Sequence, residues 1–229
     1  YSMQCLFGGI GGMFATQPIS LVLKFINWRD LFVIIAFLVF VVIICVWFLP
    51  PYKQSFIKYN QVSFGIQLQT MFGFIKDQRF WKIAPIAITG DSIMFAYLYL
   101  WIGPWMKDVA LLDSNLASKY MLFAFAGAAL GYFTNGALLN CFQRTNLVSG
   151  EKLYLTSGVL LSFFLLLIAI INPKFSLYLW PIVMFLSTMT MISFSLLNRY
   201  FTILEVGRVM SLLNFMIFFT SFLMQWFIG

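Results

Sequence analysis

The stretch that decides the fold is residues 31–49, LFVIIAFLVFVVIICVWFL, which follows Trp28-Arg29-Asp30 and ends at Pro50-Pro51. These nineteen residues contain no charged side chain. An apolar helix of about 20 residues spans the hydrocarbon core of a bilayer, and in lipid its backbone groups must pair within the segment. Because the run has no polar stripe, we expect residues 28–49 to form a transmembrane helix that faces lipid over much of its surface.

The composition extends this expectation to the whole chain. Its 229 residues are 62% hydrophobic and 9% charged, whereas a soluble domain is about 45–50% apolar and about 25% charged. The apolar runs are continuous rather than alternating with period two, which favours helices over the strands of a membrane barrel. We therefore expect an all-α, multi-pass integral membrane protein.

Six further apolar runs predict six further spans, and short connections between them favour an antiparallel up-and-down bundle. In the first run, Gly8 and Gly12 have the spacing that lets two helices approach closely, and Pro18 should kink the helix by removing a backbone donor. The expected spans are residues 1–23, 83–106, 118–139, 153–171, 177–197 and 206–229.

Residues 50–81 are the longest polar stretch and divide the chain into a pair of helices at 1–49 and a bundle of five at 82–229. Within this stretch, residues 64–80 mix apolar and polar side chains, which predicts an amphipathic helix on the membrane surface. Alternating the connections from side to side puts nine Lys and Arg on the side of this stretch and five on the other. The long stretch is therefore expected to be cytoplasmic.

Charge and residue types exclude several functions. The net charge of +7 is explained by basic loops at an anionic membrane surface, so no nucleic-acid partner is expected. The chain has no His, and Cys5, Cys45 and Cys141 are widely separated, so we expect no metal site and no cofactor. Few acids and no paired nucleophile and base argue against a membrane enzyme.

Three motifs carry a resemblance to a known family. They are Gly8-Gly9-Ile10-Gly11-Gly12 with Gln17-Pro18 and Asn27-Trp28-Arg29-Asp30, then the segment 100–109 (LWIGPWMKDV), and finally the segment 207–215 (GRVMSLLNF) with Gln225-Trp226. In this order and spacing the chain resembles the major facilitator superfamily, in a version common among bacterial transporters of unassigned substrate.

The resemblance implies that the chain is a fragment with about seven of twelve helices, the fifth to the eleventh, and that the last helix of the C-terminal bundle is missing. Residues 50–81 then connect two six-helix halves. One departure is the loop signature at 136–144, where Asn140 replaces the usual Asp and Cys141 the usual Arg. The charged network of that signature cannot form fully here.

Asp91 is the first candidate functional residue, because it lies about nine residues into a predicted span. A charged group at the centre of a bilayer costs about 2.5 kcal/mol or more on insertion scales, and such residues often line polar cavities or relay protons. The resemblance places this helix beside the central cavity. The alternative is that the span begins later and Asp91 caps it near the interface.

The other candidate functional residues also have purely structural explanations. Tyr97, Trp101 and Trp105 follow one another at intervals of four, so on an α-helix they share a face that lines a cavity or marks the membrane interface. The hydroxyl run that includes Ser193 and ends at Asn198 offers substrate contacts, or hydroxyls that bond to their own helix.

The remaining candidates concern packing and gating. Asn214 is an intramembrane amide that either joins helices or touches substrate. Gly127 and Gly131 are expected to allow close packing. Arg208 is expected to join a cytoplasmic ion-pair cluster with Arg199 and Glu205, unless this turn is simply solvated.

The function predicted from these features is secondary active transport of a small solute by alternating access, with protons as a candidate coupling ion and Asp91 as their carrier. The alternative is a seven-helix receptor or photoreceptor, suggested by the number of helices alone. A retinal protein needs a lysine in mid-membrane, and every Lys here lies near a predicted helix end or in a connection.

Overall fold

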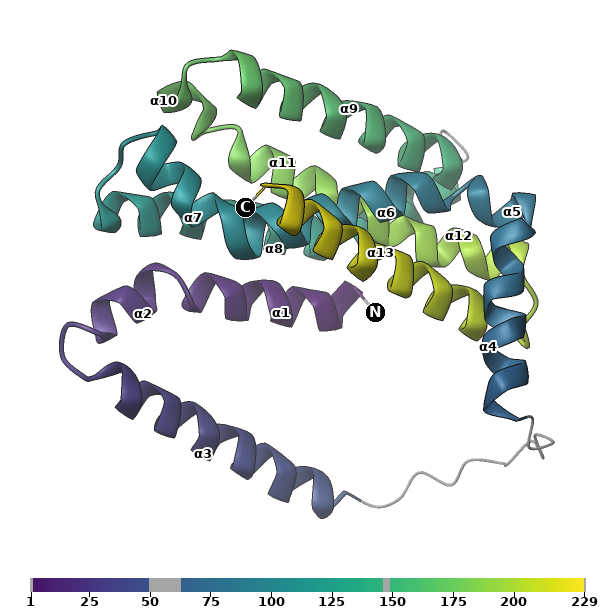
Figure 1. The fold of residues 1–229 in the computed structure, drawn as a ribbon, viewed down its shortest axis with the longest axis horizontal. Helices are drawn as coiled ribbons and strands as arrows, with labels where there is room; N and C mark the ends of the chain where they lie inside the picture. The colour runs from purple at the N-terminus through teal and green to yellow at the C-terminus, as the bar shows by residue number, and fades with distance from the viewer. Residues whose placement is uncertain (1, 50–62, 146–148, 229) are drawn as a thin grey trace.

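The computed structural model describes residues 2–49, 63–145 and 149–228, and this part of the chain is helical and contains no strand (Figure 1). The helical segments are α1 (Ser2–Phe14), α2 (Gln17–Val22), α3 (Trp28–Trp47), α4 (Phe64–Gly73), η1 (Phe74–Lys76), α5 (Gln78–Trp81), α6 (Ala84–Ile93), η2 (Met94–Trp101), α7 (Ile102–Pro104), η3 (Trp105–Val109), α8 (Ser114–Thr145), α9 (Gly150–Ile170), α10 (Pro173–Ser176), α11 (Trp180–Ser187), η4 (Thr188–Met191), α12 (Ile192–Tyr200) and α13 (Val206–Ile228). Long helices of the bundle pack against one another, and α3 lies apart from them (Figure 1).

Seven helices of the described chain are long and apolar enough to cross a membrane, as the sequence predicted. The protein is therefore an α-helical multi-pass membrane protein. The seven spans are Cys5–Val22, Trp28–Trp47, Ala84–Val109, Ser114–Leu138, Gly150–Ile170, Trp180–Tyr200 and Val206–Phe227.

The first span is broken near Pro18, where the sequence predicts a kink. Helix α1 ends at Phe14 and α2 begins at Gln17, because a proline cannot donate to the preceding turn and its ring clashes with that turn's carbonyl. After α2 the chain turns into α3, which lies apart from the bundle (Figure 1) and has no buried residue. A helix that is apolar all round and unburied by protein fits the expected exposure to lipid.

Small residues set the contact between α1 and α8. A Cβ at Gly12 would lie 2.4 Å from Phe125 Cδ1, and a Cβ at Gly9 would lie 3.2 Å from Ala129 Cα. The expectation for Gly8 was wrong, since a Cβ there would have nothing within 4 Å. The residue that faces α8 one turn before Gly12 is Gly9, since three residues of an α-helix also bring a side chain back to the same face.

Helices α8 and α11 approach still more closely. A Cβ at Gly127 would lie 2.2 Å from the carbonyl oxygen of Pro181, and a Cβ at Gly131 would lie 2.1 Å from Thr188 Oγ1. Both distances are shorter than any real contact of a Cβ atom. These two glycines therefore bring the backbones of α8 and α11 together along one seam.

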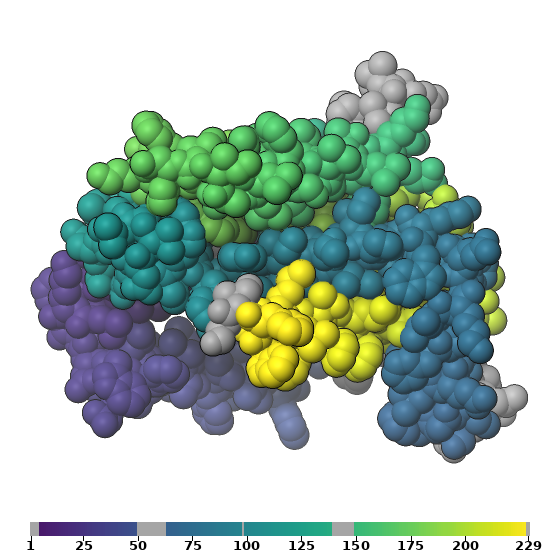
Figure 2. Space-filling view, turned by 45° about the horizontal axis from the view of Figure 1, so that its top comes forward, coloured from purple at the N-terminus to yellow at the C-terminus, as the bar shows by residue number. Residues whose placement is uncertain are grey.

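The polar stretch between the two groups of spans is described only from residue 63, and residues 50–62 of the predicted cytoplasmic loop lie outside the described part. The predicted single helix over 64–80 was wrong, because α4 stops at Gly73 and Asp77 starts a new helix, α5, by accepting a hydrogen bond from the backbone of Arg79. Helix α4 packs on α13, with the rings of Phe72 and Phe215 5.7 Å apart. In Figure 2, α4 (blue) stands at the opposite edge of the molecule from α1 and α2 (purple).

Candidate functional site

Asp91 lies in α6 and is 3% exposed, at a depth where the span Ala84–Val109 has protein on several sides. Its Oδ1 contacts the hydroxyl of Thr190, on the neighbouring segment η4. Among the described residues no Lys or Arg forms an ion pair with it. The structure thus places an acid with a hydroxyl partner, and no countercharge, inside the helix bundle.

The local backbone brings this pair together. Gly90 allows the approach, since a Cβ there would lie 2.5 Å from Thr190 Cγ2. Thr190 stands in a 3-10 turn, Thr188–Met191, which interrupts the span between α11 and α12. The neighbouring Ser92 donates from its Oγ to the carbonyl of Ile217 on α13 at 2.8 Å. Asp91 therefore joins α6 to η4, and Ser92 joins α6 to α13.

The same 3-10 turn also binds α8. Asn135 is buried and donates from Nδ2 to the carbonyl of Thr188 at 2.7 Å, while its Oδ1 has no hydrogen-bond partner in the described structure. The hydroxyls of Ser187, Thr188 and Thr190 each donate to a carbonyl three residues earlier, at 2.7–2.8 Å. The expectation that such hydroxyls bond to their own helix is confirmed for these three.

A cavity of about 320 Å³ lies against Asp91, and we call it the central cavity. Its walls come from α1, the α6–η2 segment, α8, the η4–α12 segment and α13. It is lined by Cys5, Gly8, Gly9, Asp91, Met94, Phe95, Tyr99, Tyr132, Met191, Phe194, Asn214, Ile217 and Phe218. Of the predicted site residues, the structure thus brings Gly8, Asp91 and Asn214 together around one space.

Ser193 and Asn198, the candidate residues from the run of hydroxyls, lie away from the central cavity. Ser193 is buried but does not line the central cavity, and its Oγ has no hydrogen-bond partner among the described atoms. Asn198 is exposed near the end of α12 and donates from Nδ2 to the carbonyl of Phe194, at 3.0 Å on its own helix. The substrate contact expected for Asn198 is therefore not supported, since its amide is used one turn back along the same helix.

Tyr97, Trp101 and Trp105, expected on one face of an α-helix, lie in a span that is not α-helical throughout. The span is π-helical over Met94–Trp101 and Trp105–Val109, and the wider π turn shifts side chains out of the α-helical register. Tyr97 and Trp105 both meet Trp180 of α11, with ring centroids 5.9 and 5.4 Å from it. These three rings line a second cavity, of about 820 Å³, which Trp101 does not line.

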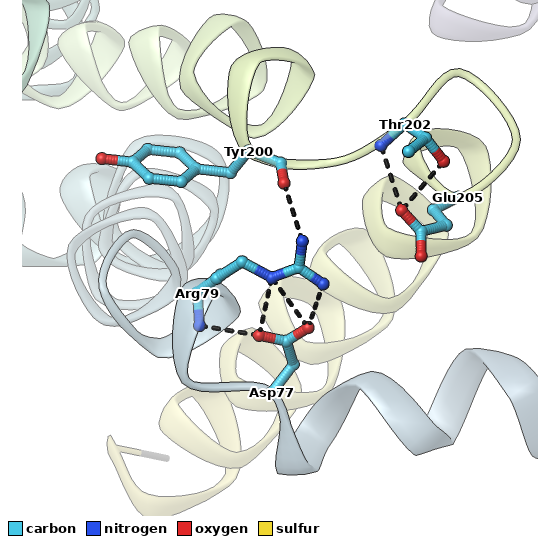
Figure 3. Close-up of polar contacts among 5 residues, drawn as sticks. All are labelled: Asp77, Arg79, Tyr200, Thr202 and Glu205. Carbon is cyan, nitrogen blue, oxygen red and sulfur yellow. Dashed lines mark hydrogen bonds and ion pairs between the residues drawn. The ribbon is translucent and has the colours of Figure 1, made fainter.

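The ion-pair cluster expected around Arg208 forms with other residues (Figure 3). Arg79 holds Asp77 in an ion pair at 2.7 Å and donates to the carbonyl of Tyr200 at 3.1 Å. The hydrogen bond from Arg79 lowers the pKa of Asp77 below its usual 3.8. Glu205 accepts from the backbone and the hydroxyl of Thr202, at 3.0 and 2.9 Å, and these bonds lower the pKa of its carboxyl.

Arg208 has no ion pair within the described chain, so of the two alternatives for this turn the cluster with Arg199 and Glu205 is not supported. Its predicted partner Glu205 accepts instead from Thr202, which lies three residues before it.

No protein-family model, curated protein or solved structure matches this chain significantly. The family therefore stays a resemblance, and the site must be interpreted from its own chemistry. The described residues contain no group of three His, Cys, Asp or Glu side chains that could hold a metal ion.

Four residues beside the candidates predicted above hold the centre of the structure together. Gly90 and Thr190 position Asp91, and Asn135 and Thr188 join η4 to α8. One signal was present, because Thr188 and Thr190 belong to a hydroxyl run in the middle of an apolar span. Nothing in the sequence alone shows that the helix tightens to a 3-10 turn there and points the two side chains at different neighbours.

Proposed function

We propose that this chain forms part of a secondary transporter of the inner cell membrane, which moves a small solute by alternating access. The observation that carries the proposal is Asp91, a buried acid on the wall of the central cavity with no ion-pair partner in the described part of the chain. Acids inside membrane spans are costly and are usually found along ion or substrate paths.

Interrupted helices support the same function. The two spans that meet at Asp91 both depart from α-helical geometry, one by a 3-10 turn and one by π-helical segments. Transport sites are typically built from discontinuous membrane helices near the middle of the bilayer, and π segments recur at functional sites.

The resemblance to the major facilitator superfamily adds an arrangement to this proposal. In this arrangement, α1 belongs to the N-terminal half of the transporter and α8 to the C-terminal half. Their contact is close, with Gly9 against Ala129 and Gly12 against the ring of Phe125, and it offers a surface on which two halves can rock. The central cavity lies beside this contact, with Gly8 and Gly9 in its wall.

Proton coupling is supported by a hydrogen count at Thr190. Its Oγ1 contacts Asp91 Oδ1 and also lies 2.7 Å from the carbonyl oxygen of Ser187. A hydroxyl has a single hydrogen and a carboxylate has none, so an ionised Asp91 has to share the hydrogen of Thr190 with the carbonyl of Ser187 in a bifurcated bond. A protonated Asp91 can donate its own hydrogen to Thr190 Oγ1 instead, so its protonation changes the hydrogen bonding of η4.

The test uses the protein in liposomes that enclose a pH-sensitive dye. A panel of amino acids, sugars, carboxylates and organic amines is added outside, and solute-dependent proton movement is recorded. We expect at least one class to move protons, Asp91→Asn to abolish this movement, and the exposed control Asp108→Asn to retain it. Solute-driven proton flux that is equal in wild type and Asp91→Asn would overturn the proposal.

A further inference from the structure

The central cavity has an unusual charge balance for a site that holds an acid. Of its lining side chains only Asp91 carries a charge at neutral pH when ionised, and neither Lys nor Arg is among them. The other titratable groups that face it are the thiol of Cys5 and the phenols of Tyr99 and Tyr132, none of which supplies a positive charge. A ligand with a positive charge therefore brings the countercharge that the described surroundings of Asp91 lack.

Aromatic rings form much of the rest of the wall. Phe95 stacks on Tyr99 with centroids 5.8 Å apart and on Phe218 with centroids 5.2 Å apart, at interplanar angles of 25° and 24°. This gives a row of three nearly parallel rings, and Tyr132 and Phe194 add two more rings to the lining. The faces of aromatic rings attract cations, above all organic ammonium groups that are weakly hydrated.

We infer that the central cavity binds a small organic cation, an amine or quaternary ammonium compound with apolar substituents. Its charged nitrogen lies toward Asp91, and its substituents lie against the rings of Phe95, Tyr99 and Phe218. The inference rests on the proposed function, and it names the class of solute that the transporter carries. An anion is disfavoured because it would meet the carboxylate, and a sugar because the wall offers few hydrogen-bonding groups.

The test compares three small molecules of the same shape and different charge. They are choline, its uncharged carbon isostere 3,3-dimethylbutan-1-ol, and the anion 3,3-dimethylbutanoate. Binding to the protein in a non-ionic detergent is measured by calorimetry at pH 8. We expect choline to bind at least about tenfold more tightly than the alcohol, and the anion to bind more weakly than either.

Variants locate the binding. Asp91→Asn should remove the preference for choline over the alcohol, and the exposed Asp108→Asn should keep it. Phe218→Leu keeps an apolar side chain but removes a ring from the wall, so it should weaken choline binding and leave the alcohol unchanged. Phe219→Leu is the matched control, because Phe219 neighbours Phe218 on α13 and is similarly exposed, 53% against 60%, but does not line the cavity.

The exposed positions 218 and 219 keep the test valid if Asp91→Asn fails to fold. Equal binding of choline and the alcohol, or equal effects of the two leucine variants, would overturn the inference. Choline binding without any transport would contradict the proposed function and leave this site standing. If choline does not bind but another solute is transported in a way that depends on Asp91, the cation site is contradicted and the proposed function stands.

Discussion

Replacing Gly127 by Ala tests the packing of the bundle most sharply. The new Cβ would lie 2.2 Å from the carbonyl oxygen of Pro181, 1.2 Å short of the 3.4 Å at which ordinary contact begins. The atom it meets belongs to the backbone of α11, so no side chain can rotate away. The two helices must separate by about that distance, and the seam at Gly131 opens with them.

Overpacking a tight contact costs about 1–3 kcal/mol, and a clash with backbone belongs at the upper end of that range. Alanine in place of glycine in a helix interior gains about 1 kcal/mol, which leaves a net loss of roughly 2 kcal/mol. For a chain of this size, 2 kcal/mol lowers the melting temperature by about 4–8 °C.

The assay is thermal unfolding in detergent, followed by intrinsic fluorescence. Gly136→Ala is the matched control on the same helix, because a Cβ there would have nothing within 4 Å, and it should be neutral or slightly stabilising. Equal melting temperatures for Gly127→Ala and Gly136→Ala would refute the close contact between α8 and α11.

Three further predictions follow from the polar contacts. Gly90→Ala puts a Cβ 2.5 Å from Thr190 Cγ2, which pushes Thr190 and its hydroxyl away from Asp91. Solute-driven proton flux in liposomes should therefore fall about tenfold. The control Gly103→Ala, whose Cβ would have no atom nearer than 3.7 Å, should leave the flux unchanged. Asn135→Leu removes the donor to the Thr188 carbonyl and should cost about 1–3 kcal/mol in thermal unfolding, whereas exposed Asn198→Ala should cost less than about 0.5 kcal/mol; equal losses would refute the special role of η4. Because its pKa is lowered in the folded protein, Asp77 adds stability above its usual pKa of 3.8 that is lost as the pH falls below it. Wild type should therefore melt above Asp77→Asn at pH 6 and together with it at low pH; a melting difference that persists at low pH would contradict the ion pair with Arg79.

The membrane-spanning helices could be predicted from the sequence because their cause is local. A run such as residues 31–49 is so long and so apolar that its length and hydropathy alone identify a membrane span. The break at Pro18 is equally local, since proline lacks the donor that a continuing helix needs.

The site could be predicted only in part, because its geometry depends on neighbours far along the chain. Asp91 stood out as an acid in an apolar run, but its partner Thr190 is 99 residues away. Spacing grouped Tyr97 and Trp105 with Trp101, but it could not identify Trp180, the ring that Tyr97 and Trp105 both contact. Gly8 and Gly9 differ only in helix rotation, which tertiary packing determines.

Alternating access requires that the cavity beside Asp91 open to each side of the membrane in turn. Cys5 lines that cavity and provides a native thiol for testing it once Cys45 and Cys141 are replaced by Ser. The measurement is labelling of Cys5 by a membrane-impermeant maleimide, applied to sealed vesicles from the outside or from the lumen. We predict that Cys5 is labelled from both sides and that a saturating transported solute shifts the balance between them. Labelling from one side only, or from neither, would contradict alternating access.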